Sequence, residues 1–230
     1  MKIYELTSGH WFPNPQGGPG DMPLAIGGDL HPDRLIKAYQ MGIFPWFNQE
    51  DPILWWSPNP RMVLYPEAIQ VSKSMRKVIR EGQFTLTFDQ AFAEVIRACQ
   101  KIPRKDQDGT WISTEIIDAY TELHHRGLAH SAEVWQDGEL VGGLYGVSLG
   151  GSFFGESMFS KVSNASKFAF IQLAQKLFEK GFDLIDCQVH TDHLESLGAV
   201  TVDRGLFLSQ LSTSLKKSTL EGNWNDLFTP

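Results

Sequence analysis

Hydrophobic positions along this chain recur with two different periods, and each period predicts a different kind of element. Over residues 164–180, apolar side chains return every three or four positions, which predicts a long amphipathic helix. The run FDLIDCQV at 182–189 is almost continuously apolar and predicts a buried strand. Two glycine-rich strands are expected around 139–159, after a hairpin signal at Asp137-Gly138.

Capping residues predict where further helices begin and end. Ser72 precedes a helix that Gly82 ends, and Ser113 opens another helix. We expect Asp89 to cap the helix AFAEVIRACQ, which a polar loop at 101–109 follows. Helices before and after an antiparallel sheet form an α+β pattern, so we expect an α+β fold.

The distribution of proline and tryptophan predicts a domain boundary. Ten of the twelve prolines and four of the seven tryptophans lie in the first 66 residues. Such a shift in composition separates regions of different architecture. We therefore expect a small Pro- and Trp-rich N-terminal domain over 1–66 and a larger domain over 67–230.

The composition of the chain mainly excludes certain classes of protein. The chain has 230 residues, of which 42% are hydrophobic and 20% charged, so it can bury a sizeable core and is not a disordered chain. No apolar run approaches the ~20 residues of a membrane span, and the N-terminus lacks the apolar segment of a secretory signal. Cys99 and Cys187 form neither a disulfide framework nor a zinc pattern, which predicts reduced thiols in a cytoplasmic protein.

Charge is distributed unevenly along the chain. The net charge is −7, yet residues 72–105 hold eight basic and three acidic side chains, a local charge of +5. Four of these basic residues share one helix face at positions i, i+3, i+4 and i+7, and we call them the basic ridge: Lys73, Arg76, Lys77 and Arg80. Such a stripe is either a solvated helix face or a surface that binds the phosphates of a nucleic acid.

An acid and an amide lie near the end of the apolar strand at 182–189. Because side chains alternate along a strand, Asp186 and Gln188 are expected to point the same way. The pair is either a structural hydrogen bond or a catalytic relay. In the relay, Asp186 accepts from the side-chain nitrogen of Gln188, whose oxygen then faces an amine nucleophile.

Three further residues are candidates for substrate binding. Glu156 lies on a glycine- and phenylalanine-rich strand, as either an edge carboxylate or a counter-charge for a cationic substrate group. Trp46 and Trp111 lie in loop-like contexts, where they either join the core or stack on a base.

Metal and thiol chemistry are less favoured. His190 and His193 are three positions apart, but no third ligand at a fitting spacing is evident, so we expect no metal. Cys187 is expected to point into the core if the strand prediction holds, which argues against a nucleophilic role.

Seven stretches of the chain together form a recognisable series. In order they are FPNP, LAIGGDLHPDRLIKAYQMGIFPWF, ILWWSPNPRMVL, LVGGLYGV, FFGESMFS, NASK and LIDCQVHTDHLESLGA. From Phe12 to Ala199 the chain resembles the bacterial leucyl/phenylalanyl-tRNA–protein transferases.

This resemblance implies a fold and a reaction. The family moves Leu or Phe, and Met more weakly, from an aminoacyl-tRNA to the N-terminal Arg or Lys of a protein, which marks that protein for degradation by the N-degron pathway. Its members are cytoplasmic and need neither a metal nor CoA. Their fold is a small N-terminal domain followed by a catalytic domain similar to the GCN5-related acetyltransferases.

The resemblance also implies roles for individual residues. Asp186 and Gln188 match the catalytic pair, and Glu156 matches a residue beside the reacting amine. The residues that would hold the donor are Trp46 and Trp111, which match aromatics around the terminal adenosine of the tRNA, and Leu144 and Phe153, which match walls of the pocket for the transferred side chain.

Other functions remain as alternatives. One is another tRNA-dependent amine acyltransferase, and another is a CoA-dependent one. The CoA alternative is disfavoured because the expected phosphate-binding turn reads SKVSNASK, without glycine. A third alternative is a non-catalytic tRNA-binding module, in which Asp186 and Gln188 are purely structural. We expect a monomer in each case.

Overall fold

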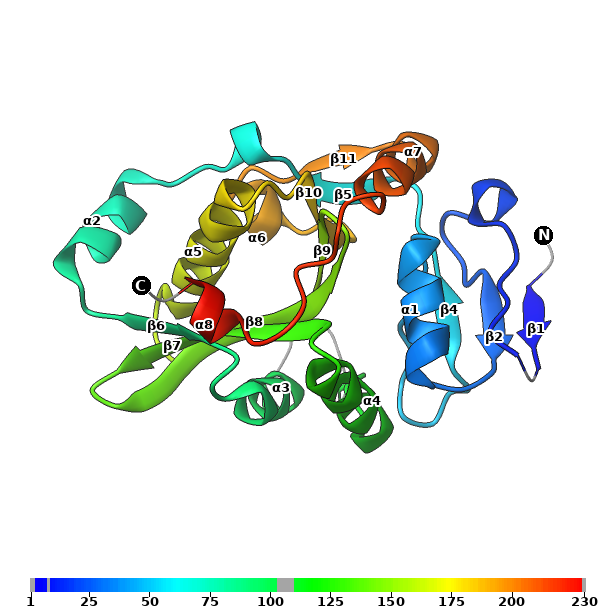
Figure 1. Ribbon diagram of the computed structural model, residues 1–230, viewed down its shortest axis with the longest axis horizontal. Coiled ribbons are helices and arrows are strands. Elements are labelled where there is room, and N and C mark those ends of the chain that lie inside the picture. Colours follow the sequence, from blue (N-terminus) through cyan, green and yellow to red (C-terminus); the bar gives the residue numbers. More distant parts are fainter. Residues whose placement is uncertain (1–2, 8, 103–109, 229–230) are drawn as a thin grey trace.

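The computed structural model describes residues 3–7, 9–102 and 110–228, which form two β-sheets with flanking helices (Figure 1). The smaller sheet is N-terminal, with strand order β1-β2-β4-β3. Its strands are β1 (Tyr4–Leu6), β2 (Ala25–Gly27), β3 (Phe44–Pro45) and β4 (Leu54–Trp56). β1 and β2 pair in parallel, and the other pairs are antiparallel.

The larger sheet has seven strands in the order β11-β5-β10-β9-β8-β7-β6. They are β5 (Arg61–Leu64), β6 (Thr85–Phe88), β7 (Ala129–Gln136), β8 (Glu139–Leu149), β9 (Ser152–Ser160), β10 (Leu184–Gln188) and β11 (Val200–Val202). All neighbours are antiparallel except β9 and β10. β5 belongs to this sheet although it precedes residue 66. The domain boundary expected at residue 66 stays a prediction.

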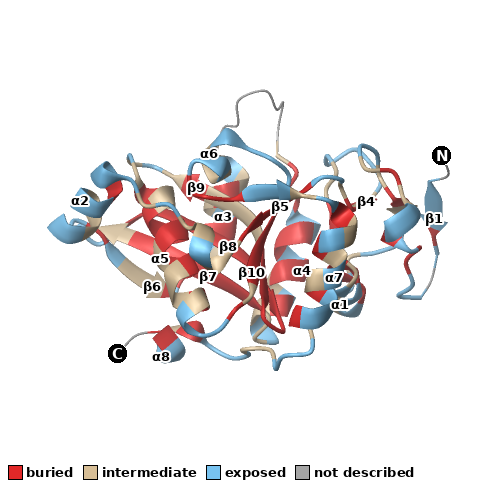
Figure 2. Ribbon diagram, turned by 90° about the horizontal axis from the view of Figure 1, so that it is seen from above, coloured by how far each residue is buried: buried red, intermediate tan, exposed pale blue. Residues whose placement is uncertain are grey.

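The helices of the described residues are α1 (Pro32–Gln40), α2 (Lys73–Glu81), α3 (Phe92–Lys101), α4 (Thr114–His125), α5 (Ala165–Glu179), α6 (Asp192–Glu195), α7 (Arg204–Ser214) and α8 (Trp224–Phe228), with 3-10 turns at Pro15–Gly17 and Pro66–Ala68. Among them, α3, α4 and α5 pack on the central strands of the large sheet, and α1 lies beside the small sheet (Figure 1). Neighbouring residues of one strand, such as Phe153 and Phe154, belong to different apolar clusters. The sheet therefore separates a core under α3 and α4 from a core under α5, and its central strands are buried (Figure 2).

The α+β prediction is confirmed, as are most of the predicted helix ends. The Ser72 hydroxyl accepts a hydrogen bond from the main-chain nitrogen of Met75 and so caps α2. The Ser113 hydroxyl accepts one from the main-chain nitrogen of Ile116 and so caps α4. Asp89 does not cap α3, so this prediction is wrong. Its carboxylate accepts instead from His130, from the main chain of Ser131 and from that of Trp224, which binds the C-terminal segment to the sheet.

Two further expectations concern loops and membranes. Residues 103–109 of the expected polar loop at 101–109 lie outside the described residues. Among the helices of the described ranges, none combines the length and the apolar character that a bilayer crossing requires.

The parallel pairing of β9 and β10 determines where a site can form. Their pairing extends from Leu184 opposite Ser152 to Asp186 opposite Phe154, and it goes no further. β9 continues to Ser160 beside β8, while β10 ends at Gln188. The two central strands therefore part beyond Asp186, and the space between them is open to side chains and ligands.

Arg204, at the start of α7, joins the N-terminal region to the large sheet. Its guanidinium donates to the main-chain oxygens of Gln16, Gly18, Pro19 and Ser57 at 2.5–3.3 Å. Charged donors give the stronger kind of hydrogen bond. These contacts tie the segment at 16–19, and the residue directly after β4, to the start of α7.

Candidate active site

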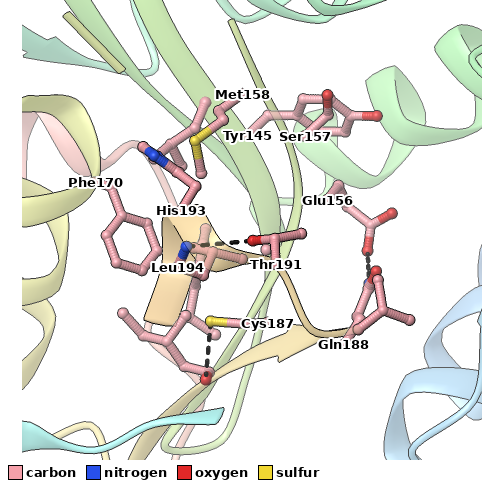
Figure 3. Close-up of a pocket in the computed structure, with 15 residues that line it drawn as sticks. Tyr145, Glu156, Ser157, Met158, Phe170, Cys187, Gln188, Thr191, His193 and Leu194 are labelled. Carbon is pink, nitrogen blue, oxygen red and sulfur yellow. Dashed lines mark hydrogen bonds between the residues drawn. The ribbon is translucent and has the colours of Figure 1, made fainter. Parts of the chain in front are cut away.

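The first recess lies where β9 and β10 part, and we call it the apolar recess (Figure 3). Its volume is about 330 Å³. Leu144 and Phe153 from the sheet and Phe170 from α5 supply apolar wall, as do Met158 and Ile185. These residues come from β8, β9, β10 and α5, so the recess exists only once the sheet and α5 have assembled.

A second recess of about 290 Å³ lies against the N-terminal region, and we call it the aromatic recess. Phe44, Pro45, Trp46 and Trp111 line it. Trp111 is buried and Trp46 is half-buried. The Trp56 indole donates to the main-chain oxygen of Trp46 at 2.6 Å, which holds this turn in place.

The two recesses meet at a shared wall. Glu156, Gln188, Val189 and Thr191 line both of them. A ligand with an apolar group in one recess and an aromatic ring in the other would therefore place the atoms between them beside Glu156 and Gln188.

Glu156 is the centre of a hydrogen-bond network at this wall. Its Oε1 accepts from the Tyr39 hydroxyl at 2.7 Å and from Nε2 of Gln188 at 2.9 Å. Its Oε2 accepts from the Tyr120 hydroxyl at 3.0 Å, and the two tyrosine hydroxyls also contact each other. Because an ionised carboxylate only accepts hydrogen bonds, the Gln188 nitrogen must face Glu156, which leaves the Gln188 oxygen as an acceptor.

Burial dominates the electrostatics of this network. It raises the pKa of Glu156 to about 7, although the hydrogen bonds from Tyr39, Tyr120 and Gln188 act in the opposite direction. Burial, together with the charge of Glu156, raises the pKa of both Tyr39 and Tyr120 well above the usual range. The tyrosines therefore remain donors at neutral pH, while Glu156 changes charge there.

Asp186 lies behind Gln188 and is fully buried. The predicted hydrogen bond between the side chains of Asp186 and Gln188 is wrong, because Nε2 of Gln188 donates to Glu156. The Asp186 carboxylate pairs instead with Arg61, and its Oδ1 accepts from the main-chain nitrogen of Gln188 at 2.9 Å. The cause is a register shift between Asp186 and Gln188, which ends the regular alternation of side chains.

Cys187, His190 and His193, for which the sequence disfavoured a chemical role, have surroundings that differ from one another. Burial, and then the charge of Asp186, raises the pKa of the Cys187 thiol, so the thiol stays protonated. His190 contacts Glu195 at 2.9 Å, whereas His193 lines the apolar recess. The two histidines therefore do not converge on one point.

The basic ridge is exposed along α2, where Lys77 makes a 3.6 Å contact with Glu81. α2 lies at the opposite end of the molecule from the N-terminal sheet (Figure 1). The fold thus brings the candidates Trp46, Trp111, Leu144, Phe153, Glu156 and Gln188 around the two recesses, with Asp186 behind them and the basic ridge apart.

Sequence reasoning missed Tyr39, Tyr120 and Arg61. Tyr39 is a buried residue of α1, and nothing in its local sequence distinguishes it from an ordinary core residue. Its 117-residue separation from Glu156 leaves no local signal of their contact. Arg61 offered one sign, a cation at the start of an otherwise apolar strand, where a buried partner is needed.

Comparison with known families accounts for most of the chain. The sequence model of the leucyl/phenylalanyl-tRNA protein transferase family matches residues 63–212. The model of the N-terminal domain of the same family matches residues 28–59.

Individual relatives align over nearly their whole length. A leucyl/phenylalanyl-tRNA–protein transferase of Desulforapulum autotrophicum is 50% identical over 97% of this chain and 98% of its own. One from Flavobacterium johnsoniae is 55% identical over 92% of this chain and 100% of its own.

Solved structures align less completely. L-PGS from Bacillus licheniformis is 14% identical with a TM-score of 0.41, over 74% of this chain and 54% of its own. A GCN5-related N-acetyltransferase from Kribbella flavida is 10% identical with a TM-score of 0.38, over 72% of this chain and 59% of its own.

Proposed function

The chain belongs to the leucyl/phenylalanyl-tRNA protein transferase family, and from that premise we propose that it transfers Leu or Phe, and Met more weakly, from aminoacyl-tRNA to N-terminal Arg or Lys. The product is a protein with a new N-terminal peptide bond and an N-degron. We further propose that the enzyme works in the cytoplasm as a monomer, without metal or CoA.

The observation that carries this proposal is the wall shared by the two recesses. An aminoacyl-tRNA ends in an adenosine whose ribose bears the amino acid as an ester. The aromatic recess suits the adenine, which would stack on Trp46 or Trp111. The apolar recess suits a Leu or Phe side chain against Leu144 and Phe153. The ester carbonyl between them would then lie beside Glu156 and Gln188.

The proposed reaction is attack of the acceptor α-amine on this ester. The amine nitrogen bonds to the carbonyl carbon, and the ribose oxygen leaves with a proton. The acceptor amine has a reference pKa of about 8, so it must lose a proton before it attacks. The Gln188 oxygen would accept a hydrogen bond from the amine and hold it in line, and such orientation supplies several kcal/mol. Glu156 would pair with the cationic acceptor.

The direct test is transfer of labelled Leu or Phe from tRNA to a peptide that begins with Arg, with a matched Ala peptide as control. The proposal expects label on the Arg peptide alone. Label on neither peptide, with tRNA still bound, would favour the binding-module alternative. Protection by CoA against thermal unfolding would favour the CoA-dependent alternative.

The basic ridge is proposed to bind tRNA phosphates. Replacing Lys73, Arg76, Lys77 and Arg80 by Ala should weaken tRNA binding and reduce the slope of log K against log [salt] by up to about 3, since each phosphate contact contributes ~0.7–0.9. Binding titrations between 50 and 200 mM salt measure this slope, and reactivity toward a minimal aminoacyl-adenosine donor serves as the control. An unchanged slope would identify the ridge as an ordinary solvated helix face.

The size of the apolar recess is proposed to select the transferred amino acid. Leu144→Phe should fill part of the recess and lower kcat/KM for Phe about tenfold relative to Leu, a typical discrimination for a steric change in an apolar pocket. Competition between Leu-tRNA and Phe-tRNA measures the ratio. Leu140→Phe, on the same strand outside the recess, is the matched control, and an equal shift in that variant would contradict the assignment.

A further inference from the structure

Arg61 and Asp186 form a buried ion pair directly behind Gln188. Nε of Arg61 donates to Oδ1 of Asp186 at 2.8 Å, and Nη2 donates to Oδ2 at 2.6 Å. Neither side chain is more than 1% exposed. We propose, on the basis of the transfer function above, that Arg61 is a positioning residue, which with Asp186 holds the Gln188 main chain so that its side chain reaches Glu156 and the reacting amine.

Gln188 needs such a restraint because of its backbone conformation. Its φ is 64°, in the left-handed region that glutamine rarely adopts. It also follows the register shift at the end of β10, after which it pairs with Met62 of β5 in a changed register. Besides this pairing, the hydrogen bond from its main-chain nitrogen to Asp186 ties the residue to the buried strand.

Asp186 has little capacity left for direct chemistry. Its Oδ1 accepts from both Arg61 and Gln188, and its Oδ2 accepts from Arg61. It is fully buried, and a substrate in either recess meets Gln188 first. The carboxylate therefore acts through Gln188, and its own position depends on Arg61.

Arg61 itself packs against two aromatic rings. Its guanidinium lies 4.8 Å from the ring centre of Phe44 and 4.6 Å from that of Phe207. Phe44 lines the aromatic recess. The planar fork of arginine, bidentate to a carboxylate and in contact with two rings, forms a rigid arrangement that lysine cannot reproduce. Arg61 thus connects the wall of the aromatic recess to Gln188.

A double-mutant cycle tests whether Arg61 acts through Asp186. Arg61→Met and Asp186→Asn should each lower kcat about 100-fold, because each leaves one buried charge unpaired. If Arg61 acts only through Asp186, the two losses do not multiply, so the kcat of the double variant should stay within about threefold of that of Asp186→Asn alone. A loss in the double variant near the product of the two single losses would show independent roles and overturn the proposal.

Two further variants keep this test decisive. Arg61→Lys retains the cation and is the more conservative change. It should lower kcat about tenfold with the KM for aminoacyl-tRNA unchanged, and a wild-type kcat would overturn the proposal. The control is the paired change Arg34→Met with Asp29→Asn, at a second bidentate ion pair in the N-terminal region. A kcat loss there equal to that of the Arg61 variants would reduce the effect to general destabilisation and overturn the proposal.

Hydrogen exchange gives a readout that needs no transfer. The Gln188 amide should exchange at least tenfold faster in Arg61→Lys than in the wild-type protein, while the amide of Ile185 in the same strand keeps its rate. Equal rates at Gln188 would overturn the inference. If the wild-type protein transfers neither Leu nor Phe, the proposed function fails, and the exchange measurement still decides whether Arg61 holds Gln188.

Discussion

Gln188→Ala is expected to lower kcat for transfer at least ~100-fold, while the KM for aminoacyl-tRNA stays within about threefold of the wild-type value. The variant removes the oxygen that would hold the attacking amine, and a loss of orientation at the reacting centre costs about this much. The donor would keep its contacts in both recesses, so its binding should persist. Initial rates at saturating Arg-peptide, with varied Leu-tRNA or Phe-tRNA, measure both constants.

A matched glutamine controls for general effects of the change. Gln210, on α7, accepts from the Tyr65 hydroxyl at 2.6 Å. Gln210→Ala should leave kcat near that of the wild-type protein. Gln188→Glu is the sharper variant, because it keeps the shape and places a second carboxylate against Glu156, so it should also lose activity. Wild-type kcat in Gln188→Ala would remove Gln188 from the mechanism.

Local signals in the sequence predicted elements well and contacts poorly. Ser72, Ser113 and the Asp137-Gly138 turn act within a few residues, and the structure confirms each of them. Asp89 carried an equally ordinary cap signal. Its carboxylate instead accepts hydrogen bonds from three donors in distant parts of the chain. These tertiary hydrogen bonds replace the local capping hydrogen bond.

The same limit applies to the site. Alternation along a strand singled out Asp186 and Gln188, but the register shift between them could not be read from an apolar pattern. Tyr39 and Arg61 act across 117 and 125 residues of sequence, where spacing holds no information. The structure places Leu144 and Phe153 in one recess and Trp46 and Trp111 in the other. The sequence grouped these residues through the family resemblance, since periodicity carries no information on contacts between distant segments.

The pH dependence of transfer is expected to report Glu156. Burial raises the pKa of this carboxyl from the usual 4.5 to about 7, so Glu156 is neutral below that pH and ionised above it. The ionised carboxylate can only accept hydrogen bonds, so it holds the Gln188 amide with its nitrogen toward Glu156. Its negative charge also attracts the cationic acceptor peptide. The wild-type kcat/KM should therefore fall below pH 7 more steeply than ionisation of the acceptor amine alone would require.

Glu156→Gln separates the two ionisations. This variant should lower kcat/KM about tenfold at pH 8, since the charge that attracts the acceptor is gone, and it should lose the added fall near pH 7. Only the amine, with its reference pKa of about 8, would then shape the profile. Glu133 is the matched control, because burial also raises its pKa while it binds Thr87 and Ser131 away from both recesses. Glu133→Gln should keep the steep wild-type profile. If Glu156→Gln keeps it too, the protonation of Glu156 does not govern transfer, and its part in the site reduces to shaping the wall between the recesses.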